Sequence, residues 1–266
     1  MAVDATVSEA GYAEEKGIRR EPVYHTRPLP SSAAAFPIGA FATTLTTLSL
    51  SLMEWRGVTI TNVYVANFFF VAALGLLISA QWELSAGNGF AYTVYSAFGL
   101  FYAGYGAVLT PSFGIRAAYG DDVAQYNNAL GFFVLLWTIF VFTFLVASIT
   151  TNLVSILIYL FVDVGFLFIA ASYFAKADGH TNAARGLQIA GGASCFIAGL
   201  LGWYLTFHLL LKDELLELPL GNTGKYFANK KAFIQGWQFA QSLRTLVPTM
   251  ASITANHHRK ARHVPI

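Results

Sequence analysis

The residues in this chain most able to do chemistry are two carboxylates that stand in apolar sequence. Glu83 is the only charged residue between Arg56 and Arg116, and Asp163 lies within the apolar run IYLFVDVGFLFIA. An ionisable group inside a membrane span costs roughly 3 kcal/mol, so it is expected to have a functional or a pairing role. For Asp163 the two interpretations are a proton or substrate relay, and a hydrogen bond to a Ser, Thr or Tyr of a neighbouring helix.

Glu83 precedes a Gly-Asn pair in the stretch WELSAGNGF. A carboxylate just before a helix can accept hydrogen bonds from the free N–H groups at the start of that helix, where the helix dipole also favours negative charge. Asn88 is well placed to cap the same helix. We therefore predict a structural role for Glu83 and Asn88, in which they hold a turn between two spans.

Hydroxyl side chains are concentrated in the stretch ATTLTTLSLSL, residues 42–52. Thr43 and Thr47 are four residues apart and share one helix face, and Thr44 and Ser51 share another. Small polar residues suit close helix crossings, but the same hydroxyls could line a path for a small polar solute. A pore lined by hydroxyls without fixed cations could pass a small anion or a neutral solute.

Other chemistries lack their motifs in this sequence. There is no P-loop, no HExxH and no Cys/His cluster, so we expect no enzyme activity, no cofactor and no metal site. The apolar segments contain no Lys or Arg in their interiors, which argues against a retinal Schiff base and against a voltage sensor. The net charge of +2 gives no reason to expect a nucleic-acid partner.

The elements that must hold these residues are membrane-spanning helices. Hydrophobic residues make up 56% of the chain and charged residues only 11%, whereas a soluble domain carries about 25% charged residues. A chain this poor in charge could not keep a 266-residue surface in water. We therefore predict an all-α integral membrane protein in contact with membrane lipid.

Six segments could each cross a bilayer, because a spanning helix needs about 20 mostly apolar residues. An even number of spans puts both termini on one side. The two tails on that side hold four and eight Lys or Arg residues, against four in the loops of the other side, so both termini are predicted to be cytoplasmic. The six predicted spans are roughly 34–53, 63–82, 90–110, 129–148, 152–174 and 187–211.

One long stretch of the sequence carries a family resemblance. The stretch FFFVAALGLLISAQWELSAGNGFAYTVYSAFGLFYAGYGA, residues 68–107, resembles the signature of the acetate uptake transporter family. That family comprises the succinate–acetate permeases of bacteria and the acetate and ammonia-export proteins of fungi. The resemblance covers about residues 34–222. Residues that match the signature at fixed offsets are Trp82, Glu83, Gly87, Asn88, Phe90, Thr93, Ser96, Gly99 and Phe101.

The family hallmark N-P-A-P-L-G-L reads AAFPIGA here, with Pro37 and Gly39 retained. The resemblance implies a six-helix protomer that assembles into a hexamer, with a substrate path through each protomer. In the family this path narrows at an apolar ring of a Phe, a Tyr and a Leu, and the matching residues are Thr43, Phe98 and Val162. Each replacement removes a ring, a hydroxyl or a methylene, so we expect a constriction wider than the family norm.

Three functions follow as hypotheses. The first is a plasma-membrane transporter or channel for small monocarboxylates, with acetate as the leading candidate and movement linked to a proton. The second is an ammonium or ammonia exporter, for which Tyr95, Phe98, Tyr102 and Asp163 could serve. The third is a non-transporting membrane sensor or scaffold. For the first, we assign the substrate path to Pro37, Gly39, Thr43, Thr46, Thr47, Thr93, Ser96, Phe98 and Val162, and the relay to Asp163.

The predicted domain organisation has three parts. Residues 1–32 are expected to form a disordered cytoplasmic tail, residues 33–222 the six-helix transport domain, and residues 223–266 a cytoplasmic C-terminal tail. The C-terminal tail could contain an interfacial amphipathic helix, or it could be partly disordered. The apolar residues at near-helical spacing in it are Phe233, Trp237, Ala240, Leu243 and Val247.

Overall fold

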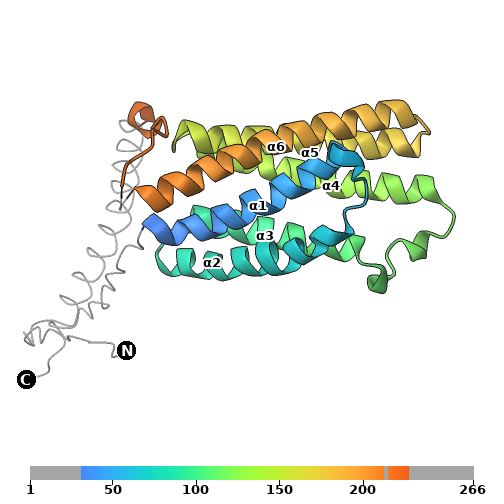
Figure 1. Ribbon diagram of the computed structural model, residues 1–266, viewed down its shortest axis with the longest axis horizontal. Helices are drawn as coiled ribbons and strands as arrows, with labels where there is room; N and C mark the ends of the chain where they lie inside the picture. The colour runs from blue at the N-terminus through green and yellow to red at the C-terminus, as the bar shows by residue number, and fades with distance from the viewer. Residues whose placement is uncertain (1–30, 213–214, 228–266) are drawn as a thin grey trace, which may run out of the picture.

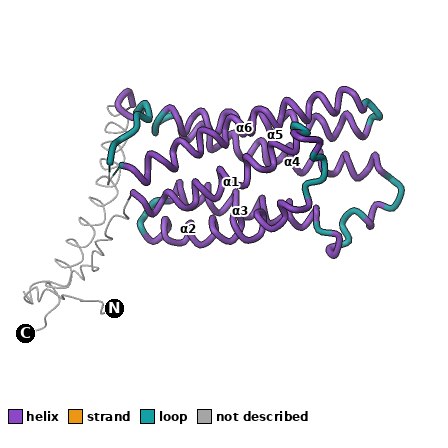
Figure 2. The backbone as a smooth tube through the Cα atoms, viewed as in Figure 1, coloured by secondary structure: helices purple, strands orange, loops and turns teal. Residues whose placement is uncertain are grey.

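The computed structural model describes residues 31–212 and 215–227, and these form a bundle of long helices that lie side by side (Figures 1 and 2). The predicted N-terminal tail up to residue 30 and the predicted amphipathic segment from Phe233 to Val247 lie outside the described residues. The helices are α1 (Ala35–Leu52), α2 (Leu74–Ser85), α3 (Gly89–Leu109), α4 (Val123–Ser148), α5 (Leu153–Ala177) and α6 (Thr181–Leu211).

The bundle has two distinct ends. The start of α1 and the end of α6 lie at one end, together with the short α2–α3 and α4–α5 turns, and we call it the terminal end (Figure 1). The α1–α2, α3–α4 and α5–α6 connections lie at the opposite end, which we call the loop end (Figure 2). The described chain therefore enters and leaves the bundle at the same end.

Within the described residues, five helical segments are long and apolar enough to cross a membrane. The chain is thus an integral membrane protein, and the described residues form helices with no strand beyond an isolated bridge between Asn152 and Asn222. The third predicted span corresponds to α3, which has 21 residues but is not one of the five. The five segments are Ala35–Leu52, Asn62–Ser85, Val123–Ser148, Leu153–Ala177 and Thr181–Leu211.

The helix starts differ from the predicted spans at α4 and α6, and α2 itself begins only at Leu74, because the preceding residues Asn67–Ala73 form a π-helix that continues into it. The spans were expected from residues 129 and 187, whereas the helices begin at Val123 and Thr181. In α4 the side chain of Asp122 accepts a hydrogen bond from the backbone N–H of Gln125 at 2.8 Å, which caps a polar first turn. Hydropathy locates the part of a helix that is apolar, and it misses polar turns that extend the same helix.

Glycines allow α5 and α6 to pack closely. A Cβ atom on Gly191 would lie 2.8 Å from the Ile169 side chain and 2.9 Å from the carbonyl oxygen of Gly165. A Cβ on Gly165 would in turn collide with the thiol of Cys195, which is buried. These contacts agree with the small-residue packing typical of membrane helices.

The segment after α6 folds back over the terminal end. The backbone N–H of Leu153 donates to the carbonyl of Gly221 at 2.8 Å, and the N–H of Thr223 donates to the carbonyl of Thr151 at 3.3 Å. The hydroxyl of Tyr204 donates to the carbonyl of Pro219 at 2.8 Å. Residues 219–223 thus satisfy a backbone donor at the start of α5, which has no partner within its own helix.

Candidate functional site

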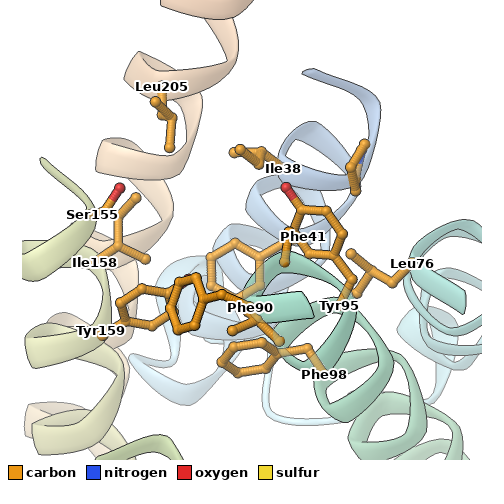
Figure 3. A pocket seen from close by; sticks show the side chains of 13 residues that line it. Ile38, Phe41, Leu76, Phe90, Tyr95, Phe98, Ser155, Ile158, Tyr159 and Leu205 are labelled. Carbon is orange, nitrogen blue, oxygen red and sulfur yellow. The ribbon is translucent and has the colours of Figure 1, made fainter. Parts of the chain in front are cut away.

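A cavity of about 170 Å³ lies in the terminal half of the bundle, which we call the main cavity (Figure 3). Side chains from α1, α2, α3, α5 and α6 converge on it. Its volume is below the roughly 300–1,000 Å³ of pockets for drug-sized ligands, so it suits a small solute. The residues that line it are Pro37, Ile38, Phe41, Leu76, Phe90, Ala91, Val94, Tyr95, Phe98, Ser155, Ile158, Tyr159 and Leu205.

The polar groups of the main cavity are hydroxyls. Tyr95 comes from α3, and Ser155 and Tyr159 come from α5, where a spacing of four residues puts them on one face. No charged side chain is among the lining residues. The cavity therefore offers apolar walls together with hydrogen-bond donors that can rotate to meet a solute.

A second cavity of about 20 Å³ lies nearer the loop end, and we call it the small cavity. On α1 the lining changes from Phe41 to Leu45 one turn later, and on α3 it changes from Phe98 to Phe101. The two cavities therefore follow one axis through the bundle. The residues that line the small cavity are Leu45, Leu48, Leu52, Phe101, Tyr102, Tyr105, Val134, Phe166, Ile169 and Cys195.

An apolar barrier separates the two cavities, and we call Phe41, Phe98 and Val162 the plug. Val162 is fully buried and lies one turn from Ile158 of the main cavity and one turn from Phe166 of the small cavity. The ring centroids of Phe41 and Phe98 are 5.2 Å apart. The two cavities are thus separate at this level in the described conformation.

Phe41 supplies the α1 side chain of this barrier, where the sequence analysis expected Thr43. Thr43 lines neither cavity, and its hydroxyl donates to the carbonyl of Gly39 at 2.7 Å. The buried face of α1 includes Phe41, Leu45 and Leu48, and helix geometry turns about 200° over two residues, so Thr43 points away from that face. A ring is therefore present beside Phe98 although Thr occupies the aligned position.

The other predicted path residues divide into those that line the cavity and those that do not. Pro37 lines it, whereas Gly39 faces the methyl group of Thr206 on α6. The hydroxyls of Thr46 and Thr47 donate to carbonyls of their own helix, at 2.6 Å to Ala42 and 2.9 Å to Thr43. Most hydroxyls of α1 are thus bound to the backbone of their own helix, whereas the Thr44 hydroxyl is buried without a partner among the described residues and the Ser51 hydroxyl pairs with that of Tyr64.

Thr93 and Ser96 on α3 also lie outside the lining of the main cavity. Thr93 is exposed, and its hydroxyl donates to the carbonyl of Gly89 at 2.8 Å. The hydroxyl of Ser96 is buried and has no hydrogen-bond partner among the described residues. Neither side chain contributes a polar group to the main cavity.

Asp163 follows Val162 on α5 and is half-buried. One carboxylate oxygen, Oδ1, is buried and has no hydrogen-bond partner in the described part of the chain. The ring contacts of α5 with α4, Phe144–Tyr159 at 6.3 Å and Phe132–Phe174 at 5.3 Å, lie on either side of it. Asp163 lines neither cavity and lies at the level of the plug, between these two contacts.

Glu83 and Asn88 form the turn between α2 and α3. The side-chain N–H of Asn88 donates to Oε2 of Glu83 at 2.7 Å, and Oδ1 of Asn88 accepts from the backbone N–H of Ala91 at 3.2 Å. Glu83 is buried, with 8% of its surface exposed. The carboxylate acts through the capping amide, which differs from the expected direct bond to free backbone N–H groups.

Replacing Asn88 by alanine should therefore destabilise the protein by about 1 kcal/mol, because the cap of α3 is lost and Glu83 loses its donor. The melting temperature of the purified protein in detergent measures this effect. Gln125→Ala, an exposed position in the first turn of α4, is the matched control and should leave the melting temperature unchanged. Equal melting temperatures for the Asn88 variant and wild type would contradict the assignment.

Four lining residues were not predicted from the sequence, namely Phe41, Ser155, Tyr159 and Leu205, and Tyr95 was predicted only for the ammonium hypothesis. A signal for two of them exists in the sequence. Ser155 and Tyr159 are hydroxyl residues four apart near the start of an apolar span, so they share one helix face. Phe41 and Leu205 resemble the many apolar residues around them, and only the packing distinguishes them.

Several known proteins are similar to this chain in sequence. The model of the GPR1/FUN34/yaaH family matches residues 17–219. The Acetate transporter protein patA of Aspergillus clavatus is 47% identical over 198 residues, which cover 74% of this chain and 80% of the relative. The Ammonia transport outward protein 2 of Saccharomyces cerevisiae is 33% identical over 179 residues, which cover 66% of this chain and 61% of the relative.

A solved structure also resembles the bundle. The structure of the bacterial acetate channel SatP matches with a TM-score of 0.61 at 20% sequence identity. The match covers 73% of this chain and 99% of that chain. The two proteins therefore share a fold.

Proposed function

Since this chain belongs to the GPR1/FUN34/yaaH family, we propose that it is a membrane transporter or channel for small monocarboxylates, with acetate as its leading substrate. The observation that carries the proposal is the main cavity, which combines apolar walls and three hydroxyls with no fixed charge. Acetate has one methyl group and one carboxylate, so it fits such a lining. A relative that is 47% identical is named an acetate transporter, which supports the same substrate.

The chemistry of the path follows from the absence of charge in the lining. Tyr95, Ser155 and Tyr159 would donate hydrogen bonds to the carboxylate, while Phe41 and Phe98 contact the methyl group. A fixed cation would hold the anion in place, whereas hydroxyls replace part of its hydration and let it leave. The plug would open to connect the main cavity with the small cavity.

Proton linkage is a further part of the proposal. Acetate has a pKa of ~4 to 5, close to that of a side-chain carboxyl. At acidic external pH part of the acetate outside the cell is protonated, and inside the cell it ionises. Asp163 is the candidate relay, because its buried oxygen has no hydrogen-bond partner among the described residues and lies at the level of the plug.

The proposed topology has six spans with both termini in the cytoplasm of a plasma-membrane protein. The 21 residues of α3 are enough for about one bilayer crossing, and the described chain enters and leaves at one end of the bundle (Figure 1). We further propose a homo-oligomer, as a hexamer in the manner of the family. The exposed apolar side chains of α4, which include Phe132, Leu136 and Phe140, would face lipid or a neighbouring protomer.

Uptake of labelled acetate tests this function directly. Yeast cells that lack their own acetate carriers should take up labelled acetate faster when they express this chain than when they carry an empty vector. Expression is checked by surface labelling or immunoblotting of a tagged chain. Uptake equal to that of empty-vector cells, with the protein present at the plasma membrane, would contradict the proposal.

Ammonium export is the second candidate, and the aromatic lining of the main cavity favours it. Cation–π attraction could hold ammonium against the rings of Phe41, Phe90 and Tyr95, and a relative is named an ammonia transport outward protein. Release of ammonia from the same cells, without a change in acetate uptake, would favour this candidate. A protein that changes neither flux would fit the third hypothesis, a membrane sensor or scaffold.

A further inference from the structure

A third cavity, of about 510 Å³, opens at the loop end of the bundle, and we call it the outer cavity. It differs from the other two because charged side chains line it. Two of them are cations, Lys176 at the end of α5 and Arg185 in the first turns of α6, and one is a carboxylate, Glu54. The remaining lining residues are Thr59, Val123, Asn127, Thr181 and Gln188.

The carboxylate of the outer cavity is already paired. Arg185 donates to Glu54 through Nε at 3.0 Å and through Nη2 at 2.6 Å. These hydrogen bonds lower the pKa of Glu54, so the pair persists at neutral pH and is lost only as the pH falls through that lowered value. The positive charge of Lys176 therefore has no carboxylate partner within 4.0 Å in the described part of the chain.

Lys176 is held in a defined place although no described carboxylate lies within 4.0 Å of its ammonium group. Its ammonium group donates to Oε1 of Gln188 at 2.7 Å and lies 5.4 Å from the ring centroid of Tyr173. The side-chain N–H of Gln188 donates to the carbonyl of Leu52 at 3.4 Å. A lysine ammonium has three donors, and the described residues occupy only one, so two remain for a ligand.

The same residues connect the outer cavity to the small cavity. The hydroxyls of Tyr173 and Tyr105 are 3.4 Å apart, and Tyr105 lines the small cavity. Leu52, whose carbonyl accepts from Gln188, lines the small cavity as well. A solute bound beside Lys176 would thus lie at the loop-end mouth of the axis that leads to the plug.

We propose that Lys176, positioned by Gln188 and Tyr173, forms a binding subsite for a small carboxylate at the loop-end mouth of the path. The inference rests on the proposed transport function and adds to it the residue that captures the anion. The two cavities along the axis have no charged lining residue, so electrostatic capture takes place at the mouth and the interior only desolvates the solute. A cation at the mouth also raises the local concentration of anions.

Kinetics of acetate uptake in carrier-deficient yeast cells test the subsite. Lys176→Met should raise the KM for acetate by about tenfold, because a charged hydrogen bond is lost, and should leave the maximal rate near that of wild type. Lys176→Arg keeps the charge and should restore most of the affinity. Raising the ionic strength should increase the KM of wild type and have little effect on that of Lys176→Met.

Lys212→Met is the matched control, because Lys212 lies at the other end of the bundle beside Glu217, at 3.7 Å, and lines neither the path nor the outer cavity. It should leave the KM unchanged. A second readout does not depend on transport. Acetate should raise the melting temperature of the purified full chain in detergent, and Lys176→Met should need about tenfold more acetate for the same rise.

The outcomes separate the subsite from the proposed function. If wild-type cells take up acetate and Lys176→Met has the same KM and the same acetate-dependent melting shift, the subsite is wrong and the transport function stands. If wild-type cells show no acetate uptake and acetate does not shift the melting temperature, the proposed function fails and the subsite fails with it. If Lys176→Met does not reach the membrane, Lys176→Gln takes its place with the same expected rise in KM, and a Lys176→Gln protein with the wild-type KM and salt dependence would contradict the subsite.

Discussion

Acetate uptake should fall to roughly a tenth or less when Val162 is replaced by phenylalanine. Val162 is fully buried between the main cavity and the small cavity, one turn from each. A phenylalanine there would add a third ring beside Phe41 and Phe98, whose centroids are already 5.2 Å apart. The plug would then need more movement to open, and the barrier to passage would rise. Initial rates of labelled acetate uptake in carrier-deficient cells measure the effect.

A size series at the same position separates a gate from a packing residue. If Val162 limits passage, uptake should fall in the order alanine, valine, leucine, phenylalanine. If Val162 only fills the core, both the smaller and the larger residues should lower stability and activity, since cavities and overpacking each cost roughly 1–3 kcal/mol. Val146→Phe, at a position of α4 that is 51% exposed, adds the same ring outside the path and should leave uptake unchanged. A maximum of uptake at valine would contradict the gate.

Two of the three plug residues could be predicted from the sequence, and the third could not. The residues matched to the family ring placed Phe98 and Val162 at the level where the two cavities are separated. The same alignment gave Thr43, whereas Phe41 contacts Phe98. Two residues along a helix change the direction of a side chain by about 200°, so an aligned position does not determine which ring fills a shared space. The expected widening of the constriction therefore does not follow from Thr43 alone.

The long helices could likewise be predicted from the sequence, whereas some of their ends could not. Apolar segments of about 20 residues predicted the long helices, because the membrane requires that length. The polar starts of α4 and α6 were missed, because hydropathy does not detect polar first turns such as the one that Asp122 caps. The Glu83–Asn88 turn was foreseen because its interactions are local in sequence. The main cavity was not predicted. Five helices contribute to it, and no local sequence pattern indicates which residues of distant helices come together.

Replacing Asp163 by asparagine should lower acetate uptake at about pH 5 by roughly tenfold or more and weaken the dependence of uptake on pH. Asparagine keeps the shape of the side chain but cannot exchange a proton. Uptake measured between about pH 5 and pH 7 in carrier-deficient cells gives the profile. Two carboxamide substitutions serve as controls and should keep the wild-type profile. They are Glu83→Gln, in the α2–α3 turn, and Asp178→Asn, exposed at the end of α5.

The melting temperature of the Asp163→Asn variant distinguishes a relay from a purely structural role, because the two roles predict changes in opposite directions. The buried oxygen of Asp163 has no hydrogen-bond partner among the described residues, and an unpaired ionised group in a span costs roughly 3 kcal/mol. Asparagine removes that charge, so the melting temperature of the variant should equal or exceed that of wild type while uptake falls. If Asp163 instead stabilises a contact with α4 or with a neighbouring protomer, the melting temperature should fall together with uptake. Loss of stability with an unchanged pH profile would therefore assign Asp163 to packing and remove it from the transport step.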